Sequence, residues 1–153
     1  PDAGGAPTVR LPATLGGEAV GVTIAHAGAL AAAAAYFPAR AGPIGLDVEA
    51  VAASHTGLEG IAFTESELAL VRAARGDRER HLLVLTLWTA KEAALKALRR
   101  GLTISLDHVV VSPRRGNWRV RVLGAAGVAP CEMDVEVAVA EGHVVALAHS
   151  GPR

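Results

Sequence analysis

The most specific chemistry in this sequence lies in residues 87–96, which hold both of its lysines. Lys91 and Lys96 are the only lysines among fifteen Lys and Arg residues, and Glu92 stands between them. A compact ammonium suits a point contact with a phosphate, whereas arginine offers a planar fork. On an α-helix Trp88, Glu92 and Lys96 would share one face, because they follow one another at intervals of four. The alternative is a solvated Glu–Lys pair worth roughly 0.2–0.5 kcal/mol.

An acidic pair is the second candidate for chemistry. Asp47 and Glu49 occupy alternate positions in I-G-L-D-V-E, residues 44–49, whose apolar pattern predicts a β-strand. Alternation along a strand places both carboxylates on one face. Neighbouring carboxylates repel each other unless water solvates them or a cation bridges them. The pair therefore predicts either a cation site or an ordinary acidic face on an exposed edge strand.

The carboxylates of Asp47, Glu49 and Glu92, with the two lysines nearby, suit a divalent cation bound together with phosphates. Mg²⁺ is the ion that this set favours, because it takes a few carboxylates and completes its shell with water and phosphate oxygens. Lys91 and Lys96 would neutralise phosphate charge that the metal does not reach. A metal-dependent phosphohydrolase built on the acidic pair is an alternative, although no further water-activating group accompanies the acids.

Two helices are predicted to position the lysine-containing stretch. Thr64 and Glu67 have the spacing of a capping box, which predicts a helix over residues 65–75. Asp77 is a predicted N-cap for a longer helix over residues 77–100. This longer helix carries both lysines in its C-terminal half.

The rest of the chain is rich in strand patterns. Residues 29–36 predict the return strand of a hairpin, although their alanines equally suit a helix. Strands, then two helices, then strands indicate an α+β fold, in which an antiparallel sheet is packed by the long helix and the shorter one. The other predicted strands cover residues 19–25, 44–49, 106–112, 117–123, 133–140 and 143–149.

Length and composition set the broad class. The 153 residues predict one domain over residues 18–150, preceded by a Gly- and Pro-rich lead-in or linker over residues 1–17. A formal net charge of zero argues against nucleic acid as a partner. The single cysteine, Cys131, excludes an internal disulfide and a cysteine-based zinc site. Together with the lack of a signal peptide or a membrane-spanning apolar run, it predicts a cytoplasmic protein.

Three motifs occur in an order that resembles the 4′-phosphopantetheinyl transferases. They are G-L-D-V-E at residues 45–49, F-T-x-x-E at 63–67 and W-T-x-K-E-A-x-x-K at 88–96, and their spacing is closest to the surfactin-type group. I-A-H-A at residues 24–27 is similar to the S-H-S element of that group. Residues 102–111 resemble the run that follows its signature helix.

The resemblance implies a reaction and a set of roles. Phosphopantetheine would pass from coenzyme A to a serine of an acyl or peptidyl carrier protein, and 3′,5′-adenosine bisphosphate would leave. Asp47, Glu49 and Glu92 would hold Mg²⁺ against the pyrophosphate, and Glu92 would also accept the serine proton, directly or through water. Lys96 and Lys91 would contact coenzyme A phosphates, with Lys96 stabilising the leaving group.

Two departures from the family pattern matter. His26 would donate to a phosphate oxygen, but Ala25 and Ala27 replace the serines that flank the family's histidine. A strand-end histidine that touches no ligand is therefore the alternative. Surfactin-type enzymes also consist of two similar halves, and this chain resembles the second half with the last hairpin of the first.

The missing half leads to expectations about partners. The resemblance implies that the site is completed by further copies of the chain, as in the trimeric holo-acyl-carrier-protein synthases, or by a neighbouring domain. The linker-like start also fits a domain of a polyketide or fatty acid synthase that modifies its own carrier domain. The alternative function is a non-catalytic half-domain that binds coenzyme A or a carrier protein without transfer.

Overall fold

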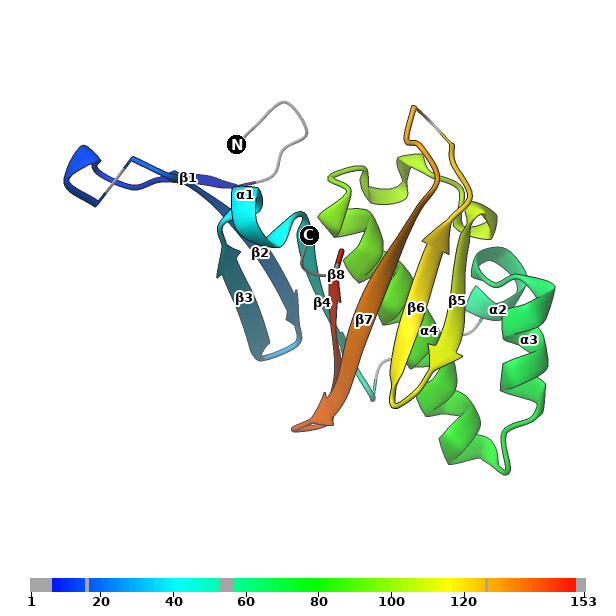
Figure 1. Cartoon of the computed structure of the whole chain (residues 1–153). Coiled ribbons are helices and arrows are strands. Elements are labelled where there is room, and N and C mark those ends of the chain that lie inside the picture. Colours follow the sequence, from blue (N-terminus) through cyan, green and yellow to red (C-terminus); the bar gives the residue numbers. More distant parts are fainter. Residues whose placement is uncertain (1–6, 16, 53–56, 126, 151–153) are drawn as a thin grey trace.

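The chain folds into two antiparallel sheets and one long helix (Figure 1). The computed structural model describes residues 7–15, 17–52, 57–125 and 127–150. The three-stranded sheet has the order β1-β2-β3, and the five-stranded sheet has the order β4-β8-β7-β6-β5. The strands are β1 (Thr8–Arg10), β2 (Ala19–Ala27), β3 (Leu30–Tyr36), β4 (Ile44–Ala50), β5 (Val109–Arg114), β6 (Asn117–Val122), β7 (Cys131–Ala140) and β8 (His143–His149). The helices are α1 (Pro38–Ala41), α2 (Leu58–Ala62), α3 (Glu65–Arg72) and α4 (Asp77–Ala97).

Helix α4 covers one face of the five-stranded sheet, and the core lies between them (Figure 1). Leu87 and Leu95 of α4 are fully buried, and they join a cluster that includes Val120 of β6 and Ala146 of β8. Antiparallel sheets commonly bury one face in this way and alternate apolar with polar residues along each strand. The predicted α+β fold with a long packing helix is confirmed.

The β2–β3 hairpin lies beside β4 (Figure 1). The amide N–H of Leu46 donates to the hydroxyl of Thr23 at 3.0 Å. Four residues further along β2, the carbonyl of Ala27 lies 3.1 Å from Nε2 of His143, which is opposite Ala50 of β4. The two contacts place β2 alongside β4 and running in the same direction, so the hairpin extends the structure past the edge of the five-stranded sheet.

The outward face of the three-stranded sheet is apolar. Thr23 and Ala25 of β2 are buried. Because side chains alternate along a strand, Ile24 lies on the opposite face, where it is 54% exposed, and Val9 of β1 on the same face is 44% exposed. The neighbours of Ile24 on β3 are exposed alanines: Ala31, Ala33 and Ala35. A contiguous exposed apolar face is a feature of surfaces that meet a partner.

The predicted hairpin is confirmed by β2 and β3, which excludes the helical alternative for residues 29–36. The capping box of Thr64 and Glu67 is also present, with the amide N–H of Thr64 donating to Oε2 of Glu67 at 2.7 Å. Helix α3 ends at Arg72, three residues earlier than predicted.

Helix α4 differs from its prediction at both ends. Gly76 is its N-cap, so the predicted N-cap role of Asp77 is wrong, and Asp77 is the first helical residue. The helix ends at Ala97 instead of residue 100. The reason is local, because Arg99 has a φ of 55° and leaves the right-handed helical region.

Short elements account for the other differences. Strand β1 lies inside the segment expected to be a lead-in and pairs with β2, and α1 and α2 lie in segments for which no element was predicted. A 3-10 turn, Leu106–His108, replaces the start of the strand predicted over residues 106–112. Two further 3-10 turns are Ala13–Leu15 and Gly101–Thr103. None of the described helices is long and apolar enough to cross a membrane.

Candidate metal and phosphate site

Gly45 allows the backbone of β4 to touch the backbone of α4. A Cβ atom at this position would lie 1.9 Å from the carbonyl oxygen of Ala93 and 2.4 Å from the amide nitrogen of Ala97. No side chain fits such a gap, because real Cβ atoms essentially never approach below 3.0 Å. The contact brings the acidic face of β4, with Asp47 and Glu49, directly against the helix.

Asp47 pairs with Lys96 across this contact. Nζ of Lys96 donates to Oδ1 of Asp47 at 2.7 Å. Asp47 is 5% exposed, whereas the Lys96 side chain is 33% exposed. Lys96 therefore joins the helix to β4 instead of pairing with Glu92 along the helix surface, which was the alternative interpretation of the sequence.

Two carboxylate oxygens in the site accept no hydrogen bond from the residues that the structure describes. Oδ2 of Asp47 and Oε1 of Glu92 are buried, and neither has a hydrogen-bond partner among the described residues. Burial raises the pKa of Asp47 despite the nearby Lys96, and Glu49 raises it further. Burial also raises the pKa of Glu92, and the charge of Asp47 adds to this effect. A cation would relieve both the desolvation and the repulsion.

Glu49 is oriented by the helix as well. Nε1 of Trp88, one turn before Glu92 on α4, donates to Oε1 of Glu49 at 2.8 Å. The described residues contain no group of three or more His, Cys, Asp or Glu side chains that could hold a metal ion. Mg²⁺ does not require one, since it usually binds one or two carboxylates and fills its other positions with water and phosphate oxygens. The unpartnered oxygens of Asp47 and Glu92 therefore fit Mg²⁺, with Glu49 beside them.

Lys91 does not belong to this site, which corrects its predicted contact with coenzyme A. Its side chain is 0% exposed and forms an ion pair with Glu67 at 2.8 Å. Its ammonium also donates to the carbonyls of Ala62 at 2.6 Å and Leu106 at 2.9 Å. Every donor of the ammonium thus has an acceptor inside the protein, and no surface remains for a ligand.

Glu67 is a structural partner that the sequence did not reveal in full. Besides Lys91 and the cap at Thr64, its carboxylate accepts the amide N–H of Val111 on β5 at 2.7 Å. It therefore ties α3, α4 and the five-stranded sheet together. A signal was present, because the F-T-x-x-E and W-T-x-K-E motifs contain Glu67 and Lys91, whose charges are opposite.

His26 lies on a different face from the carboxylates. It is exposed on β2, two residues after Ile24, and so belongs to the outward apolar face of the three-stranded sheet. Thr23 and Ala25, which alternate with it, are the residues buried on the opposite face. The predicted contact of His26 with a phosphate stays a prediction.

Comparison with known proteins agrees with this arrangement. A model described as the 4′-phosphopantetheinyl transferase superfamily matches residues 43–148, more than half of the chain. The matched range contains Asp47, Glu49, Glu92 and Lys96, whereas the three-stranded sheet lies outside it. No curated protein gives a significant match.

Solved structures share the fold. A holo-[acyl-carrier-protein] synthase from Thermotoga maritima is 21% identical, with a TM-score of 0.55, over 72% of this chain and 64% of that chain. A holo-ACP-synthase from Plasmodium yoelii is 19% identical, with a TM-score of 0.57, over 72% of this chain and 94% of that chain. The surfactin-type assignment stays a prediction. On the family match and the shared fold, the chain belongs to the 4′-phosphopantetheinyl transferase superfamily.

Proposed function

We propose that the chain catalyses Mg²⁺-dependent transfer of 4′-phosphopantetheine from coenzyme A to a serine of an acyl or peptidyl carrier protein. The observation that carries this proposal is the convergence of Lys96 with the unpartnered oxygens of Asp47 and Glu92. Phosphoryl transfer depends on positioning and charge neutralisation, and this site offers both. Family membership and the fold of two holo-acyl-carrier-protein synthases support the same reaction class.

In the proposed reaction, the serine oxygen forms a bond to the phosphorus that bears the pantetheine. The bond from that phosphorus to the bridging oxygen breaks, and 3′,5′-adenosine bisphosphate leaves. Bound Mg²⁺ would supply charge neutralisation at the pyrophosphate, held by Asp47 and Glu92 with Glu49 beside them. Lys96 donates to the leaving phosphate.

Glu92 is the proposed acceptor of the serine proton, directly or through a water molecule. Burial and the charge of Asp47 raise its pKa, which makes it a stronger base than an exposed glutamate. Asp47 is less suited to this role, because Lys96 already donates to one of its oxygens. We propose that His26 donates to a coenzyme A phosphate bound at the site of a partner, either a second copy of the chain or a neighbouring domain. This requires the partner to cover the outward face of the three-stranded sheet.

The decisive experiment incubates the protein with apo carrier protein, coenzyme A and Mg²⁺, and weighs the carrier by mass spectrometry. A gain of one phosphopantetheine is the expected result, and Asp47→Ala and Glu92→Ala should each abolish it while the protein stays folded. Glu65→Ala, at an exposed position of α3, is the matched control and should transfer normally. Transfer that survives in both site variants would exclude the proposed roles of these carboxylates.

The alternative is a non-catalytic half-domain that binds coenzyme A or a carrier protein. It is motivated by the resemblance to the second half of the surfactin-type enzymes; the chain spans 64% of the Thermotoga protein and 94% of the Plasmodium protein. In the same experiment this alternative predicts an unchanged carrier mass together with coenzyme A binding. Loss of coenzyme A without any change in the carrier would instead indicate hydrolysis.

We further propose that a second copy of the chain or a neighbouring domain completes the site. With Lys91 buried, Lys96 is the one lysine at the described carboxylates. His26 and the exposed Ile24 lie on an apolar face that a partner would cover. Mixing His26→Ala with Asp47→Ala should restore transfer if two copies share a site. A monomer in sedimentation that still modifies the carrier would refute the need for a partner.

A further inference from the structure

His143 lies between two backbone carbonyls at one end of the five-stranded sheet. It is the first residue of β8, and its Nδ1 lies 2.8 Å from the carbonyl oxygen of Glu141 in the turn that joins β7 to β8. Its Nε2 lies 3.1 Å from the carbonyl oxygen of Ala27, the last residue of β2. The side chain therefore connects this turn to the hairpin tip, residues 26–31 between β2 and β3 (Figure 1).

The two contacts determine how many protons the ring carries. A carbonyl oxygen accepts hydrogen bonds and donates none, so each ring nitrogen of His143 needs a hydrogen to bond its carbonyl. A neutral imidazole has one N–H group and one lone pair, whereas the charged imidazolium has two N–H groups. The charged ring alone makes both bonds. In a neutral ring, one nitrogen and its carbonyl would direct lone pairs at each other.

The contact with Ala27 is the one that a neutral ring should lose. The contact with Glu141 joins residues two positions apart, and it is the shorter of the two. Glu141 and Gly142 have φ values of 50° and 73°, the left-handed pair that a two-residue hairpin turn requires, so the turn itself holds the Glu141 carbonyl in place. The carbonyl of Ala27 instead belongs to an exposed tip, next to Gly28.

The rest of the hairpin is held independently of His143. The amide N–H of Leu46 donates to the hydroxyl of Thr23 at 3.0 Å, and Thr23 and Ala25 are buried. Neither the amide nor the hydroxyl titrates near neutral pH. A change of charge at His143 should therefore move the hairpin tip, which carries His26, and leave the other end of the hairpin in place.

Other titratable groups lie on the elements packed around His143. They are Glu141 in the turn, His26 on β2, Glu49 on β4 and His81 on α4. The residues directly opposite His143 are Ala140 on β7 and Ala50 on β4, and neither is charged. Replacing His143 alone separates its titration from that of these neighbours.

We propose that charged His143 holds the hairpin tip against the five-stranded sheet, and that loss of its proton frees the tip. His143 is then a positioning residue for His26, the neighbour of Ala27. Because histidine exchanges its proton between about pH 5 and 8, the tip is fixed below this range and free above it. This attachment does not depend on the proposed function; its effect on transfer does, through the role given to His26.

The direct test is ¹⁵N NMR of the histidine rings in the full chain. Both nitrogens of His143 should carry protons at pH 5.5, and one of them at pH 8. Amide hydrogen exchange of the hairpin tip, corrected for the intrinsic effect of pH, should become about tenfold faster at pH 8, a change of about 1.4 kcal/mol. Loss of a hydrogen bond to a charged group has about this effect. A neutral ring at pH 5.5 beside a protected tip would overturn the proposal.

A variant pair separates charge from shape. His143→Gln should exchange its tip amides about tenfold faster than the unmodified chain at pH 5.5, and within twofold of it at pH 8. His149→Gln, on the same face at the other end of β8, is the matched control and should leave the tip unchanged at both pH values. Equal exchange by His143→Gln and the unmodified chain at pH 5.5 would overturn the proposal. So would a difference of the same size at both pH values, which would indicate a purely structural role.

Phosphopantetheine transfer is measured on the same samples. The rate of His143→Gln divided by that of the unmodified chain should lie below one at pH 5.5 and near one at pH 8, and the titration of Glu92 cancels in this ratio. A ratio of one throughout, with tip exchange that follows His143, would reject the positioning of His26. Absence of transfer in every sample would reject the proposed function alone, whereas transfer with tip exchange indifferent to His143 would reject the attachment alone.

Discussion

The two lysines of α4 each meet a carboxylate, but their surroundings are opposite. The Lys91–Glu67 pair is 0% exposed on both sides, and its ammonium donates to two further carbonyls. The Lys96–Asp47 pair is partly open to solvent, and Oδ2 of Asp47 has no hydrogen-bond partner among the described residues. All hydrogen-bond donors of the Lys91 ammonium have acceptors within the fold, whereas the Lys96–Asp47 pair leaves a carboxylate oxygen available to a ligand.

The difference shows how one helix can serve structure and chemistry together. Burial lowers the pKa of Lys91, although Glu67 opposes this effect, so the interior pair depends on its partners to remain charged. At the open pair, burial raises the pKa of Asp47, because Lys96 compensates only part of its desolvation. A satisfied buried pair fixes geometry, whereas an unsatisfied one is a feature of functional sites.

Breaking the interior pair should have the largest effect. Glu67→Ala leaves the Lys91 charge buried without its carboxylate and removes the acceptor of two backbone N–H groups, so we expect a loss of about 3–5 kcal/mol in the free energy of unfolding. Urea unfolding measures it. Glu65→Ala, an exposed position in the same turn, is the control and should change stability by less than about 0.5 kcal/mol. Equal midpoints for the two variants would remove the distinction between the pairs.

Breaking the open pair should instead affect transfer. Lys96→Ala removes a donor to the leaving phosphate, so the transfer rate should fall about 100- to 1000-fold. Stability should fall by only about 1 kcal/mol, because the Lys96 side chain is 33% exposed and water can reach Asp47 in its place. Transfer rates and urea midpoints are measured on the same samples. If Lys96→Ala loses as much stability as Glu67→Ala but retains transfer, then Lys96 serves the fold and not the reaction, which contradicts this prediction.

Added Mg²⁺ should stabilise the open site and leave the interior pair unaffected. At ten times its dissociation constant, an ion that binds only the folded chain adds about 1.4 kcal/mol. Thermal unfolding in MgCl₂, compared with NaCl of equal ionic strength, measures this gain. Asp47→Asn and Glu92→Gln should lose it, whereas Glu65→Gln should keep it. A gain that persists in both site variants would place the ion elsewhere.

The pH dependence should be the smallest effect. Without added metal, the folded chain holds protons on Asp47 and Glu92 at pH values where the unfolded chain has released them, because both pKa values are raised. Stability should therefore fall as pH rises from the ordinary carboxyl pKa through the raised values. Glu92→Gln should flatten this slope, and exposed Glu132→Gln should not. With Mg²⁺ present, deprotonation favours binding and the slope should lessen or reverse.

The sequence predicted the parts of the fold that depend on local patterns. The capping box at Thr64, the β2–β3 hairpin and the strand that carries Asp47 follow from spacing and alternation. It did not predict the burial of Lys91, because helical spacing says which residues share a face but not which face is covered. Five residues on a helix turn through about 140°, so Lys91 and Lys96 had to face different surroundings.

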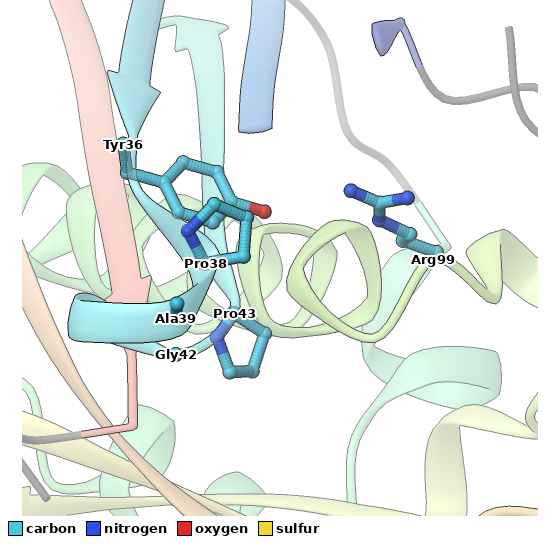
Figure 2. A pocket seen from close by; sticks show the side chains of 6 residues that line it. All are labelled: Tyr36, Pro38, Ala39, Gly42, Pro43 and Arg99. Carbon is cyan, nitrogen blue, oxygen red and sulfur yellow. The ribbon is translucent and has the colours of Figure 1, made fainter. Parts of the chain in front are cut away.

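Features that depend on distant contacts escaped prediction. Strand β1 is three residues long and exists through its pairing with β2. A pocket lined by Tyr36, Pro43 and Arg99 (Figure 2) brings residues before β4 together with the segment after α4, about sixty positions later in the sequence. Local sequence patterns do not indicate which distant segments come into contact. The sequence grouped the carboxylates of Asp47 and Glu92 by their chemistry and by the family motifs, whereas their unpartnered oxygens required coordinates.

The contact at Gly45 has a consequence for redesign. Because main chain meets main chain there, the spacing between β4 and α4 does not depend on which side chains occupy positions 47, 49, 92 and 96. A combinatorial library at these four positions, with Gly45 kept, would vary ligand identity on a constant frame. Screening it against Mn²⁺, Co²⁺ or Zn²⁺ would show how far the metal preference of the site can be changed without rebuilding its scaffold.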